Sequence, residues 1–552
     1  MKEKLTLFLK RNWILILILL GAALLRLWQL GSIPPSLTPD EASLGYNAYS
    51  ILKTGKDEYG KVLPIIFKSF GDYKPGFYVY LTVPFVATLG LTEFAVRFPS
   101  AIAGIISIIL VYLITGQFFK KKKLSLISAF VLSITPWAIY LSRGAWEVNV
   151  SLTLTLLGIY LFFKAFENQK LLILSAFSFA LTLITYQGAK LSTGLVLLIL
   201  AVLYRKEILR INKKYLIGGI VTGLLISLPI ILSLFQGQTG RLSVFSIFSY
   251  ERPKEYIQAI LNQGKESTGD LNYDLFHSET LNFARGIMTR WFNHFSGRFL
   301  FFEGDWQNPR HTAPYQGVLL MSDLIILVLG FFALVKLGSK KEYLFIWFWL
   351  ILAPLPAALS RDQVHAIRAF NLVIPLTFIL SFGWLKLVES SKKWILIFLP
   401  IFLVSFIYFL DAYFIHVPKH NSQYWEYGYK QIVETIIPIQ NNYKKIKVQQ
   451  SFAQPYIYFL FYEKYDPVKY QKQAKLTENE NKGDVGLVEN IDNIYFVPIN
   501  WSADKGEKGT LLVADLVNIS LEDSKDENHF KLIKEIKYLN GYVTAFRIIE
   551  VK

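Results

Sequence analysis

The chain has 552 residues, of which 53% are hydrophobic and 18% are charged, and it contains no cysteine. An average soluble domain carries about a quarter charged residues. Here the apolar residues form long uninterrupted blocks, so the sequence predicts a polytopic membrane protein. The lack of cysteine excludes a disulfide scaffold, thiolate-ligated zinc, iron–sulfur clusters and thiol nucleophiles.

The net charge of +17 raises the question of nucleic-acid binding. Residues 419–552 hold 18 basic and 18 acidic side chains, so the whole excess lies in residues 1–418, with 40 basic against 23 acidic. A basic excess in the membrane half is what the positive-inside rule predicts for cytoplasmic turns. We therefore expect no nucleic-acid partner.

Eleven apolar stretches approach the roughly 20 residues that a membrane span needs. A twelfth, residues 75–90, is interrupted by Pro84 and Gly90. The basic amino end and Lys120–Lys123 can both be cytoplasmic only if two spans separate them, so residues 75–90 are expected to lie along the membrane surface or to re-enter from it. The predicted spans are residues 13–30, 96–118, 124–141, 150–166, 171–187, 191–204, 215–235, 318–337, 343–359, 369–388 and 393–413.

This topology predicts a multi-pass plasma-membrane protein with a cytoplasmic amino terminus. The first outer loop is residues 31–95, a long outer loop is residues 236–317, and everything after residue 413 lies outside. The apolar start lacks a small-residue cleavage site, so we expect an uncleaved anchor and prefer a bacterial membrane. We assign residues 1–413 to a transmembrane catalytic domain and 414–552 to an extracytoplasmic soluble α/β domain. That domain is expected to contain a helix at 424–436 and strands within 445–452, 494–499, 510–516 and 542–551.

The unusual polar residues gather on the predicted outer face, beginning with Pro39-Asp40-Glu41. Thr38 and Glu41 form the pattern of a capping box with proline at the first helical position, which predicts an amphipathic helix. The box leaves Asp40 without a structural role, at a helix start where ionised carboxylates are favoured. From these residues alone, catalysis by Asp40 and simple capping both remain open.

Four further polar groups lie on the same predicted face. Each by itself has the composition of a headgroup anchor, but five such sites on one side favour a functional cluster. Within the last group, His365 and Arg368 stand at i and i+3, so we expect them to share a helix face and bind one anion together. The groups are Gly71-Asp72-Tyr73-Lys74-Pro75, Ser142-Arg143 with Glu147 and Asn149, Tyr186 with Lys190, and Arg361–Arg368 with Asn371.

Other motifs limit the chemistry further. The sequence has no P-loop and no GxGxxG motif, which argues against an ATP-driven pump or a dinucleotide enzyme. The acidic and histidine residues of the long loop have no regular metal-ligand spacing, so no metal site is assigned, although a divalent metal cofactor stays open. These residues are His277, Glu279, Glu303, Asp305 and His311, with Arg310 beside them.

The order of these motifs resembles the GT-C membrane glycosyltransferases of the protein O-mannosyltransferase and aminoarabinose-transferase type, also described as dolichyl-phosphate-mannose-protein mannosyltransferase-like. The resemblance is specific over about residues 20–190 and implies a polytopic α-helical GT-C fold. It implies about 11 transmembrane helices, interfacial helices in the first outer loop and an extracytoplasmic C-terminal α/β domain. It rests on an amino-terminal span followed by Pro39-Asp40-Glu41, Gly71-Asp72-Tyr73-Lys74-Pro75 and Glu93-Phe94-Ala95-Val96-Arg97-Phe98-Pro99-Ser100.

The resemblance implies an enzyme that moves a sugar from a polyprenyl-phosphate donor to a lipid, glycan or protein acceptor. Such a transfer needs a base, a cationic cradle for the departing phosphate, and exclusion of water, and a single displacement inverts the anomeric carbon. The family's acidic residue maps onto Asp40 and its Lys-Pro motif onto Lys74-Pro75, although Gly76 stands where many relatives have a second proline. The predicted roles are catalytic for Asp40 and Glu41, donor-phosphate binding for Lys74, Arg143, His365 and Arg368, and substrate binding for Asp72, Tyr73, Tyr186 and Lys190.

Three alternatives stay open. A lipid or polysaccharide transporter would also have many spans, but it should place charged or broken-helix sites near the bilayer midplane. A noncatalytic scaffold would need no convergent carboxylate and cations. A polymer ligase that uses a lipid diphosphate donor is the nearest enzymatic rival.

Overall fold

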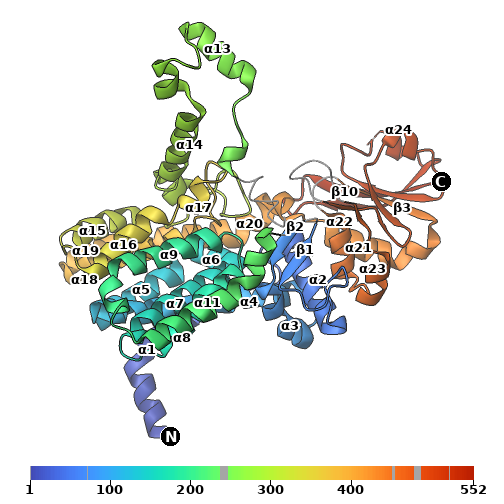
Figure 1. The fold of residues 1–552 in the computed structure, drawn as a ribbon. Helices are drawn as coiled ribbons and strands as arrows, with labels where there is room; N and C mark the ends of the chain where they lie inside the picture. The colour runs from blue at the N-terminus through green and yellow to red at the C-terminus, as the bar shows by residue number, and fades with distance from the viewer. Residues whose placement is uncertain (1, 71, 236–245, 451–453, 478–485, 521) are drawn as a thin grey trace.

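A computed structural model describes residues 2–70, 72–235, 246–450, 454–477, 486–520 and 522–552 (Figure 1). A helical bundle makes up most of the chain. A carboxyl-terminal sheet domain lies at one end of the bundle, and an arm that carries α13 (Lys254–Gly264) and α14 (Glu279–Asn293) projects away from it. The first ten residues of the predicted long loop, 236–245, lie outside the described residues.

Among the described residues, five helices are long and apolar enough to cross a membrane, so the chain is a membrane protein. A sixth is formed if α5 (Lys122–Ile134) and α6 (Pro136–Ser142) count as one span, bent by 59° where Pro136 lacks a backbone donor. The predicted number of eleven spans remains a prediction. The five are Glu93–Phe119 (α4), Glu147–Ala165 (α7), Lys213–Ser233 within α11 (Lys213–Phe235), Phe370–Glu389 with α18 (Val373–Glu389), and Lys392–His420 with α19 (Lys392–Asp411).

Further helices, most of them shorter, complete the bundle and its connections. Four of them are apolar, namely α3 (Phe77–Leu89), α8 (Leu171–Leu183), α9 (Ala189–Leu203) and α15 (Asp323–Val335). The predicted interfacial stretch 75–90 corresponds to α3, and its place in the membrane remains a prediction. The remaining bundle helices are α1 (Lys2–Leu27), α10 (Arg205–Ile208), α16 (Lys341–Leu352), α17 (Leu355–Ala358) and α20 (Val417–His420).

The predicted first outer loop, residues 31–95, contains α2 (Pro39–Thr54), and the predicted capping box at the start of this helix is confirmed. The Thr38 hydroxyl accepts the Glu41 backbone N–H at 3.2 Å, and the Glu41 carboxylate accepts the Thr38 N–H at 2.9 Å. The helix ends at Gly55, whose φ of 67° is the left-handed conformation that glycine adopts without strain. A hairpin of β1 (Ile66–Ser69) and β2 (Asp72–Pro75) follows and pairs Phe67 with Lys74.

The carboxyl-terminal domain is a six-stranded mixed sheet in the order β6-β7-β3-β8-β10-β9. β3 is parallel to β7 and β8, whereas β10 is antiparallel to β8 and β9. The predicted α/β domain is thus confirmed, but edge strand β9 was not predicted, because its Lys and Glu side chains hide the apolar face. The strands are β3 (Lys445–Gln449), β6 (Asn490–Ile491), β7 (Ile494–Val497), β8 (Thr510–Ala514), β9 (Phe530–Lys537) and β10 (Thr544–Val551), with a separate pair β4 (Leu476–Thr477) and β5 (Leu487–Val488); the helices are α21 (Tyr429–Ile436), α22 (Pro455–Tyr462), α23 (Pro467–Gln473) and α24 (Trp501–Asp504).

One hydrophobic core joins the first outer loop to the sheet domain, since buried residues of α2, α3, α21, α22 and the sheet form a single cluster. Gly45 of α2 is needed there, because a Cβ at this position would lie 2.6 Å from Val96 and would also meet Phe461 of α22. The Tyr458 hydroxyl donates to the Leu37 carbonyl at 3.1 Å. The sheet domain therefore holds the start of α2, and the division at residue 414 remains a proposal because this core crosses it.

Candidate active site

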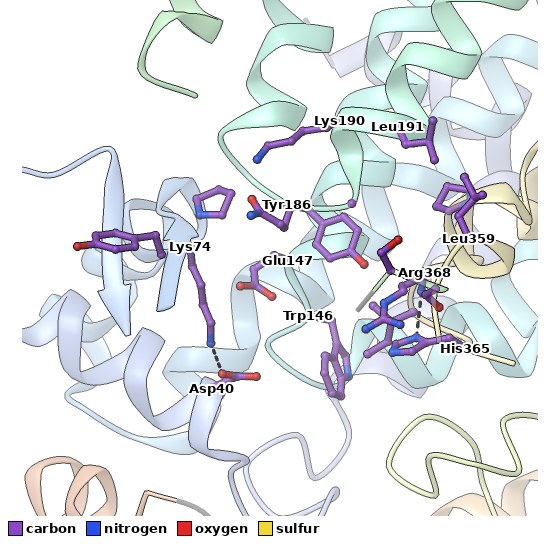
Figure 2. Close-up of a pocket in the computed structure, with 18 of the residues that line it drawn as sticks. Asp40, Lys74, Trp146, Glu147, Tyr186, Lys190, Leu191, Leu359, His365 and Arg368 are labelled. Carbon is purple, nitrogen blue, oxygen red and sulfur yellow. Dashed lines mark hydrogen bonds and ion pairs between the residues drawn. The ribbon is translucent and has the colours of Figure 1, made fainter. Parts of the chain in front are cut away.

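A pocket of about 530 Å³ lies between α2, the β1–β2 hairpin, the start of α7, the turn between α8 and α9, the base of the arm, and the segment that follows α17 (Figure 2). It brings together seven residues that the sequence nominated, from positions far apart in the chain: Asp40, Tyr73, Lys74, Tyr186, Lys190, His365 and Arg368. The other lining residues are Pro75, Trp146, Glu147, Gln187, Gly188, Leu191, Ser246, Phe248, Pro356, Leu359, Ser360 and Ile367.

Asp40 and Lys74 form an ion pair at one wall of the pocket (Figure 2). Asp40 lies in the first turn of α2 with half of its side chain exposed, and Lys74 extends from β2 over the ring of Phe70. The helix start supplies backbone N–H dipoles that stabilise the carboxylate, and the hairpin fixes the ammonium beside it. Asp72 opens β2, but its side chain lies outside the described part of the structure.

A second carboxylate, Glu147, also lines the pocket, and Figure 2 shows it on the same side as Lys74 and Asp40. Glu147 is the first residue of α7, where the helix dipole again favours negative charge. The sequence placed Glu147 at the outer face without a role. The sequence signal that could have identified Glu147 as a pocket residue is its position at the start of a span, directly after Trp146.

The opposite wall carries nitrogen groups. Arg368 donates to Asp362 at 2.7 Å, and its backbone N–H donates to Nδ1 of His365 at 3.3 Å. The expectation that His365 and Arg368 share a helix face is wrong, because residues 364–369 form an extended segment and a turn before the next helix. Burial lowers the pKa of His365 well below its usual value, and the nearby Arg368 charge lowers it further. His365 therefore faces the pocket as a neutral imidazole at pH 7.

Glu41 does not line the pocket, although the sequence nominated it beside Asp40. Its carboxylate is buried and accepts hydrogen bonds from the Arg97 guanidinium, from the Thr38 N–H, and from the Ala145 N–H at 2.8 Å. Arg97 also donates to the carbonyls of the segment before α2, namely Leu30, Pro34 and Ser36. These contacts give Glu41 a structural role that orients α2.

Arg143 also lies outside the pocket. Its buried guanidinium donates to the carbonyls of Leu25, Trp28 and Ile33 and to the Tyr413 hydroxyl. These four contacts leave little capacity for a phosphate. The side chain instead joins the end of α1 to the carboxyl-terminal end of α19.

A second cavity of about 550 Å³ is a neighbour of the first one, and Lys190 lines both. Its walls come from α7, α8, α9 and α11, and they are almost entirely apolar. Representative lining residues are Phe179, Leu183, Leu197, Leu216 and Ile220. The arrangement is an apolar groove next to the pocket that carries the charged residues, with Lys190 in the lining of both.

Beside His365, the structure brings together two residues of the long loop that sequence spacing did not connect. His311 Nδ1 lies 2.8 Å from Asp305 Oδ2, and the His311 and His365 rings are 4.9 Å apart. Ligand atoms of Asp305, His311 and His365 all lie within 4.8 Å of one another. Two imidazoles and a carboxylate are a donor set that zinc accepts, and a carboxylate on Nδ1 is the contact that orients a metal-binding imidazole. These three residues could hold a divalent metal.

Known proteins share features of this sequence and of this fold. Residues 74–232 match the family described as dolichyl-phosphate-mannose-protein mannosyltransferase. No protein of curated function matches the sequence. The chain is similar in structure to ArnT from Cupriavidus metallidurans bound to undecaprenyl phosphate, with a TM-score of 0.56 and 12% identity over 97% of this chain and 98% of that one.

ArnT from the same organism in the apo state gives a TM-score of 0.52 with 11% identity, over 98% of both chains. An Archaeoglobus fulgidus oligosaccharyltransferase tethered with an acceptor peptide gives 0.49 with 13% identity, over 92% of this chain and 70% of that one. The ArnT comparisons cover nearly the whole chain and show the fold. The chain therefore has the fold of the GT-C membrane glycosyltransferases, and the resemblance that its sequence motifs carry is confirmed.

Proposed function

We propose that this protein is an inverting glycosyltransferase that moves a sugar from a polyprenyl-phosphate donor to a lipid, glycan or protein acceptor. One observation carries the proposal. A pocket with a carboxylate on one wall and nitrogen groups on the other lies beside an apolar groove, and Lys190 lines both. A donor that combines a sugar, a phosphate and a long hydrocarbon chain matches a charged pocket next to an apolar groove.

Asp40 is the base in this proposal. The acceptor oxygen attacks the anomeric carbon, its proton passes to Asp40, and the bond between that carbon and the phosphate oxygen breaks with both electrons leaving on the phosphate. A single displacement inverts the anomeric carbon. Lys74 contacts Asp40 and holds its carboxylate at the pocket wall, so we assign Lys74 to positioning the base rather than to the phosphate.

The donor phosphate is proposed to lie near Lys190 and Arg368, because both line the pocket and Lys190 also lines the apolar groove. Charged hydrogen bonds from these two groups would stabilise the negative charge that grows on the phosphate as the sugar leaves. His365 contributes a neutral hydrogen-bonding group at this wall. Tyr73 and Tyr186 are proposed to contact the sugar, since both line the pocket.

One of the similar structures, that of ArnT, holds bound undecaprenyl phosphate. That ligand agrees with the donor class inferred from this chain's own cavities. We also propose the predicted topology, with the pocket and the sheet domain on the outer face of a bacterial plasma membrane, where prenyl-linked sugars replace nucleotide sugars as donors. If a divalent metal binds at Asp305, His311 and His365, it would supply positive charge next to the phosphate wall.

The pocket argues against the transporter alternative. Its charged residues come from helix starts and connecting segments rather than from the middle of spans. A polymer ligase that uses a lipid diphosphate would need the same apolar groove, so only the products distinguish it. Mass spectrometry of surface glycans from cells with the protein, without it, and with Asp40→Asn tests the proposal. Loss of one added sugar residue in the last two samples is expected, whereas loss of a whole polymer would favour the ligase.

A further inference from the structure

The arm between α11 and α15 has an apolar surface that the proposed reaction does not use. On α14, Phe283, Gly286, Arg290 and Asn293 face the rest of the protein. Phe283 packs edge-to-face with Phe248, Arg290 donates to the Arg361 carbonyl, and Asn293 donates to the Gln363 carbonyl. The exposed face of the same helix is mixed in character. It carries Met288 and Phe292, 59% and 60% exposed, together with the exposed Ala284, Arg285 and Thr289.

The turn at the far end of the arm repeats this pattern. Leu271, Leu275 and Phe276 are 70%, 54% and 58% exposed. The arm nevertheless has internal hydrogen bonds that hold its shape, because Arg252 near its start donates to the Glu279 carboxylate and to the His277 carbonyl, both at 2.5 Å. A structured segment that leaves several large apolar side chains uncovered indicates a surface made for an apolar partner.

The position of α14 identifies that partner. The Trp291 indole N–H donates to the Ile351 carbonyl at 2.8 Å, so the end of α14 lies against the bundle helix α16. Phe348 and Ile351 of α16 are 41% and 47% exposed, and many apolar side chains of the helices long enough to cross a membrane are exposed in the same way, as is expected of side chains that face lipid. The apolar face of α14 thus continues a lipid-facing surface, and a tryptophan marks the junction, as is common at membrane interfaces.

We propose that the arm, residues 250–293, lies on the membrane leaflet at the pocket's side, with Leu271, Leu275, Phe276, Met288 and Phe292 in the boundary between headgroups and acyl chains. The arm carries nearly balanced charge, so the attraction is the burial of apolar area rather than anionic lipid. Figure 1 shows the arm extending well away from the bundle, which gives it a wide lipid contact.

This placement has a consequence for the pocket. Ser246 and Phe248, at the base of the arm, line the pocket, and the Ile247 N–H donates to the Leu359 carbonyl at 3.0 Å. A lipid-bound arm therefore holds one pocket wall at the level of the membrane surface. The lipid interaction does not depend on the proposed reaction and can be measured without any substrate.

The experiment uses the absence of cysteine in the chain. Met288→Cys and Phe292→Cys in the full-length protein each give a single site for a fluorescent label, after reconstitution into phosphatidylcholine vesicles with or without brominated acyl chains. Thr289→Cys is the matched control, since it is exposed and lies about 100° around the helix from residue 288. Leu225→Cys on α11, 64% exposed, is the lipid-facing reference.

We expect labels at 288 and 292 to lose fluorescence with brominated lipid, as at 225, and to resist aqueous iodide. The label at 289 should be quenched mainly by iodide. Iodide quenching at 288 and 292 equal to that at 289, without an effect of brominated lipid, would overturn the proposal. Protection from both quenchers together with crosslinking between copies through residue 288 would also overturn it, because the face would then bind a second copy.

Discussion

Glu41 accepts hydrogen bonds from Nε and Nη2 of Arg97 at 3.0 and 3.3 Å. Both side chains are buried, so water does not reach this contact. The same carboxylate caps α2 and accepts the Ala145 N–H just before α7. One buried pair therefore fixes the directions of two helices whose first turns carry the pocket carboxylates Asp40 and Glu147. Asp40 and Glu41 are adjacent in the sequence but thus have different roles, since Asp40 lines the pocket and Glu41 forms the buried pair that orients the helices.

Replacing Glu41 should destabilise the fold. Glu41→Gln leaves the buried Arg97 charge without its counter-ion, and breaking a buried pair in this way costs about 3–5 kcal/mol. Thermal unfolding of the purified protein in detergent measures the loss. Glu93→Gln is the control, because the Glu93–Lys430 pair at 2.8 Å is partly exposed and should cost about 0–1 kcal/mol. Equal, small losses for both variants would contradict the structural role of Glu41.

Replacing Asp40 should leave the fold intact and stop the reaction. Asp40→Asn preserves the size of the side chain but removes the base, so turnover should fall by about 10²-fold or more. Glu147→Gln is the comparison, because its carboxylate lines the same pocket. Circular dichroism checks folding, and transfer from a prenyl-linked donor measures turnover. A larger loss for Glu147→Gln than for Asp40→Asn would move the base to Glu147.

Replacing Lys190 or Arg368, the residues proposed to contact the phosphate, should weaken binding of the donor. Lys190→Gln and Arg368→Gln should each cost about 1–3 kcal/mol of interaction with the phosphate. Because the phosphate gains charge as the sugar leaves, at least one variant should lower kcat and not only raise KM. Asp362→Asn removes the partner of Arg368 without changing a pocket residue, so it should retain donor affinity. An equal effect of Asp362→Asn would mean that the Arg368 effect is structural.

Stability should depend on Glu58, a buried carboxyl in the first outer loop that is bonded to Asn47 at 3.1 Å. Burial, reinforced by Asp57, raises its pKa from 4.5 to about 8. The folded state keeps the proton at pH values where the unfolded chain has lost it, so the contribution of Glu58 to stability is fully present below pH 4.5 and is lost as pH rises through about 8. Glu58→Gln should flatten this decline in the unfolding midpoint, whereas Glu434→Gln on the exposed face of α21 should not. If the unfolding midpoint of Glu58→Gln declines with pH as in the wild type, groups other than Glu58 cause the decline.

Zinc should stabilise the protein if Asp305, His311 and His365 bind it. A ligand that binds only the folded state raises the unfolding midpoint, and His311→Ala should abolish that rise. His277→Ala is the control, because His277 lies on the arm and pairs with Glu266 at 3.5 Å. Metal content after dialysis gives a second measurement. An equal zinc shift in both variants would exclude this site.

Much of the fold was predictable because membrane spans and caps leave local signals. The apolar lengths predicted the bundle, and the Thr38–Glu41 box predicted the start of α2. The bend at Pro136 was not predicted, although a proline inside an apolar run is a signal for a kink, because the span 124–141 was assigned from its apolar length alone. Edge strand β9 was missed since its charged residues mask a period-two pattern.

The candidate site was predictable only in part. Seven nominated residues line one pocket because an outer face collects the ends of many spans. Arg143 carries the same sequence signal as Arg368, yet it donates to carbonyls of the α1 end, and spacing alone could not separate the two. The Asp305–His311–His365 group joins residues far apart in the sequence, which only the tertiary structure brings within 4.8 Å.

The most direct test of the account offers the purified protein two radiolabelled donors separately, a polyprenyl-phosphate sugar and the matching nucleotide sugar, with an extract of cell-envelope acceptors. Wild type and Asp40→Asn are compared under both conditions. We predict transfer from the prenyl-linked donor by the wild type, and at least about 10²-fold less by Asp40→Asn. Transfer from the nucleotide sugar alone, or undiminished transfer by Asp40→Asn, would contradict the account.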